Sequence, residues 1–78
     1  MPIEPGTTQY LFYSNSFLRG QARSKDCVVV TWPSGFVQSM TAQTWDQREF
    51  LREPGRARLL EGRDIGRAQA LFAAHAAG

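Results

Sequence analysis

The strongest constraint on the fold is the segment at positions 27–32, Cys-Val-Val-Val-Thr-Trp, in which four consecutive residues are β-branched. Such side chains fit the pleated surface of a sheet, and the lack of polar alternation is typical of a central strand. The turn sequence Pro33-Ser34-Gly35 follows, and residues 36–41 have the composition of a second short strand. Proline fixes φ at the first turn position, and glycine supplies the left-handed position of a three-residue loop. We therefore predict a β-hairpin over residues 27–41.

The register of this hairpin follows if Trp32 faces Phe36 across the turn. Val30 then faces Gln38 and Val28 faces Met40, because side chains alternate between the two faces of each strand. The face with the largest apolar groups is expected to meet the helices; it carries Val28, Trp32, Phe36 and Met40. The opposite face has more hydroxyl groups and is expected to be more open; it carries Cys27, Val29, Thr31, Val37, Ser39 and Thr41.

A further strand is predicted upstream of the hairpin. Residues 7–13 combine threonine with aromatic residues, which is the composition of a strand. Residues 14–16 indicate a turn or bend, and residues 17–22 extend the strand past that bend, with Gly20 marking a bulge. Residues 1–7 contain two prolines and are predicted to form an irregular lead-in.

Two helices are predicted in the second half of the chain. Residues 44–47, Thr-Trp-Asp-Gln, match a capping box and predict a helix over residues 45–53 that stops before Pro54-Gly55. A second helix is predicted over residues 64–76. Its apolar stripe at helical spacing consists of Ile65, Ala68, Leu71, Phe72 and Ala76. Residues 56–61 between the helices fit either a short edge strand or an extended link.

Together these elements predict one α+β domain over residues 1–78. Its sheet has three antiparallel strands, or four if residues 56–61 join it, with two α-helices packed on one face. The short chain excludes nicotinamide, flavin and P-loop enzymes as complete domains, because a cofactor cavity of about 300–1,000 Å³ would take up much of the core. No apolar run approaches the roughly 20 residues of a membrane span. Residues 1–8 lack the features of a signal peptide, so a cytoplasmic protein without a membrane contact is expected.

Catalytic chemistry is not expected from this sequence. The only histidine, His75, lies near the end of the second predicted helix, where fraying does not give the fixed orientation that a catalytic relay needs. Asp46, Glu49 and Glu53 alternate with arginines, a pattern typical of a solvated helix face. We therefore expect no enzyme activity, no small-molecule substrate, no cofactor and no metal site.

Arginines and aromatic residues are the best candidates for a binding role. Eight of the nine basic residues are arginine, whose planar guanidinium forms bidentate hydrogen bonds with carboxylates and phosphates. If the two basic groups of the chain meet at one end of the sheet, they form a positive rim; the alternative is solvated arginines paired with nearby acids. The predicted partner-binding residues are Arg19, Arg23, Lys25, Arg56, Arg58, Arg63, Tyr13 and Phe17.

Cys27 is the only cysteine, so a disulfide within the chain is impossible and a zinc site is not indicated. Its predicted place on the open sheet face leaves two alternatives. It is either a small buried apolar residue or the link of an intermolecular disulfide in a homodimer.

The predicted layout resembles the small phage-encoded anti-CRISPR proteins that disable type I effector complexes in bacteria. The resemblance rests on the single α+β domain, on the lack of catalytic residues, and on residues 10–13 (Tyr-Leu-Phe-Tyr) and 28–32 (Val-Val-Val-Thr-Trp). It implies a non-enzymatic inhibitor in the bacterial host cytoplasm that docks on a subunit of the type I CRISPR effector (Cascade) and blocks interference with target DNA. Several members of that family are acidic DNA mimics, whereas this chain carries a net charge of +2.

Two alternatives remain open. A three-stranded sheet followed by a helix is similar to the small DNA-binding domains of some phage integrases, which makes nucleic acid a secondary candidate partner. That function needs arginines on the open sheet face, and the predicted hairpin has none there. The other alternative is a phage accessory or assembly protein.

Overall fold

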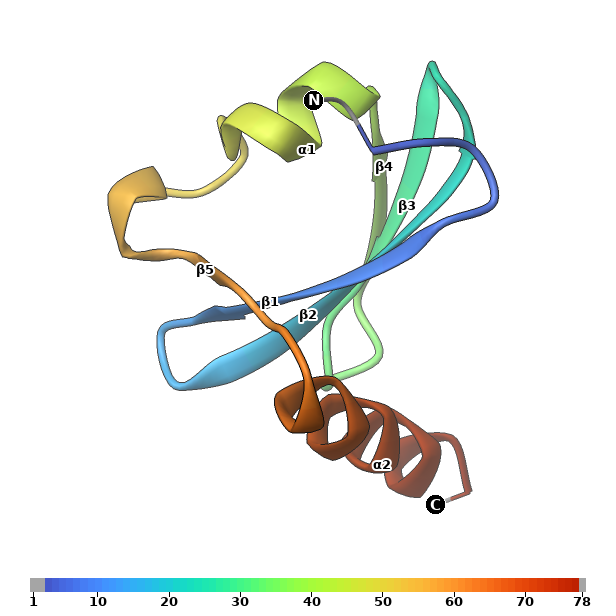
Figure 1. Ribbon diagram of the computed structural model, residues 1–78, viewed down its shortest axis with the longest axis vertical. Coiled ribbons are helices and arrows are strands. Elements are labelled where there is room, and N and C mark those ends of the chain that lie inside the picture. The colour runs from blue at the N-terminus through green and yellow to red at the C-terminus, as the bar shows by residue number, and fades with distance from the viewer. Residues whose placement is uncertain (1–2, 78) are drawn as a thin grey trace.

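The computed structural model describes residues 3–77, with side chains as far as residue 74. It shows an α+β fold with a five-stranded antiparallel sheet and two α-helices (Figure 1). The strand order is β4-β3-β2-β1-β5. The elements are β1 (Thr8–Tyr13), β2 (Ser16–Ser24), β3 (Cys27–Thr31), β4 (Val37–Met40), α1 (Ala42–Gln47), the 3-10 turn η1 (Pro54–Arg56), β5 (Arg58–Leu59) and α2 (Arg63–Ala77).

The sheet has five strands, whereas the sequence predicted three, or four with residues 56–61. One of the missing strands arises because residues 14–16 hold a full chain reversal. Ser14 and Asn15 have φ angles of 51° and 60°, and Tyr13 pairs directly with Ser16. A two-residue hairpin loop with positive φ at both positions matches the twist of its strands. The predicted bent strand is therefore two strands, β1 and β2. Residues 58 and 59 pair with β1 as strand β5. Of the two alternatives for residues 56–61, the short edge strand is therefore the one that the structure shows.

The β3–β4 hairpin has the predicted register. Val28 pairs with Met40, and Val30 pairs with Gln38. The backbone N–H of Trp32 donates to the carbonyl of Phe36 at 2.9 Å, and Gly35 has a φ of +96°. The left-handed glycine thus closes the three-residue turn as its sequence predicts.

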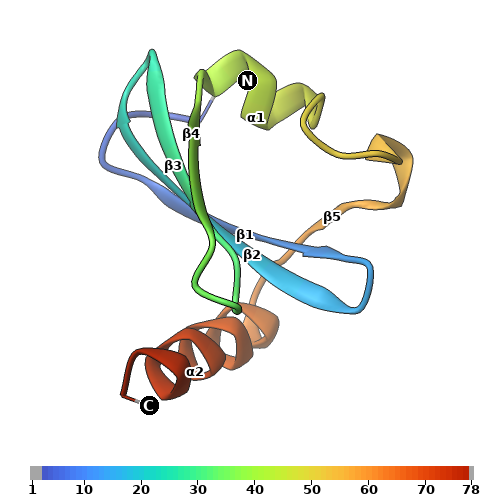
Figure 2. The same ribbon diagram turned by 180° about the vertical axis from the view of Figure 1, so that it is seen from behind.

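The two helices lie on opposite faces of the sheet, which corrects the prediction that both pack on one face (Figures 1 and 2). Trp45 of α1 is buried in one core together with Leu11 of β1. Phe72 of α2 is buried in a second cluster together with Tyr10 of β1. Consecutive residues of a strand point to opposite faces, so Tyr10 and Leu11 make both faces apolar. Each face needs its own cover, and the chain has one helix for each.

Helix α1 begins earlier and ends earlier than predicted. Thr41, not Thr44, is the N-cap, and its hydroxyl accepts a hydrogen bond from the Thr44 N–H at 3.2 Å. The helix ends at Gln47 because Arg48 adopts a left-handed conformation with a φ of 57°. Two threonines at a spacing of three residues offer the same capping chemistry, and the chain uses the first.

Helix α2 agrees with its predicted range to within one residue at each end. Ala68 and Phe72 of the predicted stripe are buried, and Ile65 packs against them. Ala76 lies outside the residues whose side chains are described. Within residues 3–77, no helix is both long enough and apolar enough to cross a membrane.

The predicted bulge at Gly20 was wrong. Gly20 pairs regularly with Gln9 and with Val30, and the irregularity in the β2–β3 ladder falls between Ala22 and Ser24. The absence of a side chain at position 20 has another cause, which is the close approach of Trp45. The sheet therefore passes unbroken beneath α1.

Candidate functional site

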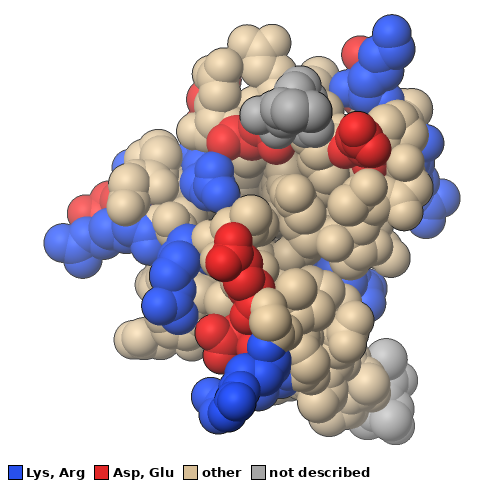
Figure 3. Space-filling model, viewed as in Figure 1, with Lys and Arg blue, Asp and Glu red and all other residues tan. Residues whose placement is uncertain are grey.

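The predicted basic residues do not meet at one end of the sheet. Arg23 and Lys25 are exposed at the β2–β3 turn, whereas Arg58 pairs with Phe12 near the other end of β1. Arg56 and Arg63 are exposed in η1 and at the start of α2. Figure 3 shows Lys and Arg side chains spread over several parts of one face, with acidic side chains between them. No continuous positive rim is formed on that face.

Several of these predicted residues have local partners. Arg56 forms an exposed ion pair with Glu53 at 3.6 Å. The guanidinium of Arg58 lies over the ring of Phe12 at 5.8 Å, and that ring contacts Phe17 at 5.5 Å between centroids. Exposed pairs of this kind contribute little to stability and leave their groups hydrated. They give no indication of a shaped binding site.

Tyr13 and Phe17 are half-buried and take part in packing. The Tyr13 hydroxyl accepts a hydrogen bond from the backbone N–H of Glu53 at 3.1 Å, which anchors the chain ahead of η1. Phe17 packs against the cluster beneath α2. Their aromatic rings thus serve the two cores of the fold.

Arg19 differs from the other arginines because it lies in the middle of a strand. It pairs with Tyr10 of β1 and with Thr31 of β3, and its side chain lies on the face covered by α2. The guanidinium carbon is 4.9 Å from the centroid of the Phe72 ring. The Nε atom is fully buried, and no group among the described residues forms a hydrogen bond with it. Arg19 also forms no ion pair with the described acidic residues.

A pocket of about 240 Å³ opens beside Arg19, between the β3–β4 turn and α2. Figures 1 and 2 both show this turn coming close to α2. Its lining consists of turn residues 33–35 together with Arg19, Thr31, Trp32 and Phe72. Aromatic walls, two hydroxyl-bearing residues and one cation therefore surround this space, which we call the Arg19 pocket. Among the residues that the structure describes, no acidic one lines it.

Two large apolar residues are exposed at the tip of the β3–β4 hairpin, whose turn lines the Arg19 pocket. Phe36 is 58% exposed and Val37 is 53% exposed. Val37 pairs with Thr31, which lines the pocket, and so lies on the same sheet face as Arg19. Phe36 follows the turn directly and pairs with Trp32, which places it on the other face at the tip of the hairpin. The prediction that Phe36 meets the helices was wrong, because its place after the turn takes it beyond the reach of α1. We call Phe36, Val37 and the Arg19 pocket the hairpin-tip surface.

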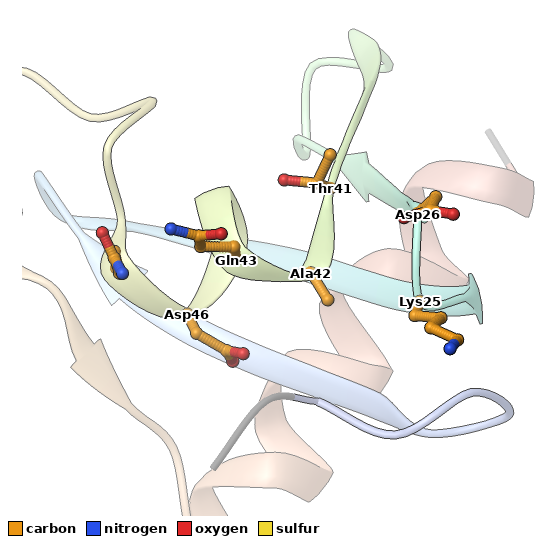
Figure 4. Close-up of a pocket in the computed structure, with 7 residues that line it drawn as sticks. Lys25, Asp26, Thr41, Ala42, Gln43 and Asp46 are labelled. Atoms are coloured by element: carbon orange, nitrogen blue, oxygen red, sulfur yellow. The ribbon is translucent and has the colours of Figure 1, made fainter.

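A larger hollow of about 580 Å³ lies between the β2–β3 turn and the start of α1, and residues that line it are drawn in Figure 4. Its charged groups are Lys25 and Asp26, both of the β2–β3 turn, and Asp46 of α1. The Asp46 carboxylate already accepts the backbone N–H of Ile3, at 3.0 and 3.2 Å from its two oxygens. This contact fastens the N-terminal segment to α1. Asp46 thus has a structural role in this hollow.

Cys27 is a half-buried free thiol at the start of β3. Among the described residues, no group of three or more His, Cys, Asp or Glu side chains could hold a metal ion.

Comparison with known proteins yields no relative: no family model, no curated protein and no solved structure matches this chain. The function of the hairpin-tip surface therefore has to be inferred from its residues alone. Sequence reasoning singled out Arg19 but missed Phe36 and Val37. The signal for Phe36 was its place as an aromatic residue directly after a hairpin turn.

Proposed function

We propose that this chain is a non-enzymatic binding module that attaches to a larger protein through the hairpin-tip surface. The observation that carries the proposal is the exposure of Phe36 and Val37, at 58% and 53%, at the tip of a hairpin whose Val37 face also carries the half-buried Arg19. Burying apolar area on a partner contributes about 25 cal/mol per Å². Aromatic residues and arginine are also the types that contribute most at protein interfaces.

The chemistry of the surface indicates the kind of partner. Phe36 needs an apolar recess, and the guanidinium of Arg19 needs a negative group a short distance away. Charge complementarity of this kind fixes register and suppresses wrong partners. The partner is thus a protein with an apolar recess beside an acidic residue.

In its specific form, the proposal takes a subunit of a type I CRISPR effector as that protein. The identity of the target rests on the resemblance of the sequence to phage-encoded anti-CRISPR proteins. Docking on Cascade blocks target DNA either by covering its path or by holding one conformation of the complex. A phage assembly protein would require the same surface with another partner.

A sheet-type DNA-binding module is not supported by a specific feature of the fold. On the sheet face that carries α2, the residues of β3 and β4 include no basic one; they are Cys27, Val29, Thr31, Val37 and Ser39. Binding to duplex DNA depends on contacts between basic side chains and phosphates. The β3–β4 hairpin therefore supplies no phosphate contact of this kind.

The test combines a binding assay with an interference assay. The purified chain is mixed with type I effector complexes, and complex formation is followed by size-exclusion chromatography while cleavage of target DNA is measured. We expect a stable complex and loss of cleavage with the wild type. Phe36→Ala is expected to weaken binding by at least about tenfold, equal to about 1.4 kcal/mol.

Leu59→Ala provides the matched control. Leu59 is 38% exposed on β5, at the sheet edge opposite β4. This variant should bind like the wild type. If no type I effector binds the chain, the specific target is wrong; if Phe36→Ala binds as tightly as Leu59→Ala, the hairpin-tip surface is not the interface.

A further inference from the structure

The Arg19 side chain is held in place before any ligand arrives. Its guanidinium lies over the Phe72 ring, 4.9 Å from the centroid, and the strand pairs of β2 fix its backbone on both sides. A cation over an aromatic face is attracted by the ring, and an ordered guanidinium loses little freedom when it pairs. The arginine is thus ready to receive a partner group.

The same arginine lacks the partners that a buried cation ordinarily has. Its Nε–H is shielded from solvent and donates to no described residue, and no described carboxylate forms an ion pair with it. A shielded donor without an acceptor is unfavourable, because it has lost water without gaining a hydrogen bond. The Arg19 pocket adjoins the same side chain, so an acceptor bound there would supply the guanidinium with the partner that it lacks.

The neighbouring turn offers few backbone donors to such an acceptor. The Gly35 N–H donates to the Trp32 carbonyl at 2.9 Å, and the Trp32 N–H donates to the Phe36 carbonyl. The Phe36 N–H donates to the Ser34 hydroxyl oxygen at 3.5 Å. Phosphate sites commonly use several free backbone N–H groups or more than one cation. The Arg19 pocket has one cation, which matches the single charge of a carboxylate.

We propose that the Arg19 pocket is a binding site for one carboxylate group, supplied by an aspartate or glutamate side chain of the protein that docks on the hairpin tip. The source of the carboxylate rests on the proposed function, whereas the site itself does not. Arginine pairs with the two oxygens of a planar carboxylate through parallel N–H donors. Thr31 and Ser34 place hydroxyl groups in the same lining.

The first test uses the isolated chain with acetate as the probe. In ¹H–¹⁵N spectra of the full chain, acetate should shift the Arg19 Nε–Hε resonance and the amides of Ser34 and Gly35 in a saturable way. Inorganic phosphate at matched ionic strength should bind no more tightly. A linear, unsaturated response to acetate, or tighter binding of phosphate, would overturn the proposal.

Two variants identify the group that binds. Arg19→Lys keeps a cation near Phe72 but removes the planar pair of N–H donors. The affinity for acetate, measured from the shifts at Ser34 and Gly35, should therefore fall by at least about tenfold. Arg23→Gln, an exposed arginine on the same strand, should titrate like the wild type. An unchanged titration of Arg19→Lys would overturn the assignment. If that variant fails to fold, the wild-type Nε–Hε titration still decides the question.

A second test identifies the source of the carboxylate. When the docked protein fills the Arg19 pocket, acetate should no longer shift the Arg19 Nε–Hε resonance. A persistent response in the complex would mean that the partner does not supply the carboxylate. Because the acetate titration needs no partner, its failure would leave docking through Phe36 intact, and failure of docking would leave the carboxylate site intact.

Discussion

The indole ring of Trp45 occupies the space where a side chain at position 20 would lie. A Cβ atom built on Gly20 would come within 2.5 Å of Cζ2 of Trp45. Trp45 is only 1% exposed, stacks on Phe50 at 5.7 Å between ring centroids, and donates its Nε1–H to Gln9 at 2.9 Å. The ring is thus held on three sides, and a glycine is needed beneath it.

Gly20→Ala is therefore expected to destabilise the fold, although alanine is ordinarily the better residue in a strand. The added methyl group has no free volume, and overpacking of a core costs about 1–3 kcal/mol. Urea unfolding followed by tryptophan fluorescence measures the loss. A stability equal to that of the wild type would show that the Trp45 ring can move aside.

Gly66→Ala is the matched substitution with the opposite expectation. Gly66 lies in the first turns of α2, and a Cβ atom there meets nothing within 4 Å. Alanine in a helix is favoured over glycine by about 1 kcal/mol. The same urea measurement should therefore show a gain, so the two variants separate steric contact from a general effect of removing glycine.

The sequence predicted those parts of the fold that depend on neighbours in the chain. The turn residues 33–35 and the strand pattern around them determined the register of β3 and β4, and the apolar stripe determined α2. The contact between Gly20 and Trp45 joins residues 25 positions apart, so no local pattern indicates it. The arrangement of the helices was missed for a related reason. Both faces of β1 are apolar, and the sequence does not say which helix covers which face.

The candidate site was predicted in part. Arg19 was singled out by its charge, but its buried Nε atom and its place over Phe72 depend on how α2 crosses the sheet. Phe36 was assigned to the core because the predicted register, which was correct, places it on the same face as Val28 and Met40. A residue at the end of a hairpin can share the core face and still extend past the helix, which is what Phe36 does.

The N-cap of α1 is expected to contribute measurably to stability. The Thr41 hydroxyl accepts the Thr44 N–H at 3.2 Å, so Thr41→Ala leaves that donor without a side-chain partner. Loss of an N-cap costs about 1 kcal/mol. Thr44→Ala removes only the hydroxyl contact with Thr41 at 3.0 Å and should cost less. Thermal unfolding of both variants checks the order, and the reverse order would place the cap at Thr44.

Phe36 at the hairpin tip and Phe72 in the lining of the Arg19 pocket should respond differently to truncation. Phe36 is mostly exposed, so Phe36→Ala should change the free energy of unfolding by no more than about 0.5 kcal/mol. Phe72 is 6% exposed and packs against Tyr10, so Phe72→Ala should cost about 3–5 kcal/mol. Urea unfolding of the two variants measures both changes in the free energy of unfolding. A large loss in Phe36→Ala would mean that this residue holds the hairpin together and is not free for binding.

Oxidation is expected to link two copies of the chain through Cys27. The thiol is half-buried and belongs to the part of the sheet face that α2 leaves uncovered, where a second copy can approach. Non-reducing electrophoresis of air-oxidised protein should show a band of twice the monomer mass, which a thiol reductant removes and Cys27→Ser never forms. Bacterial cytosol keeps thiols reduced, so cells lysed in an alkylating agent should yield the monomer. A monomer in the oxidised sample would mean that the thiol is too shielded to meet its counterpart.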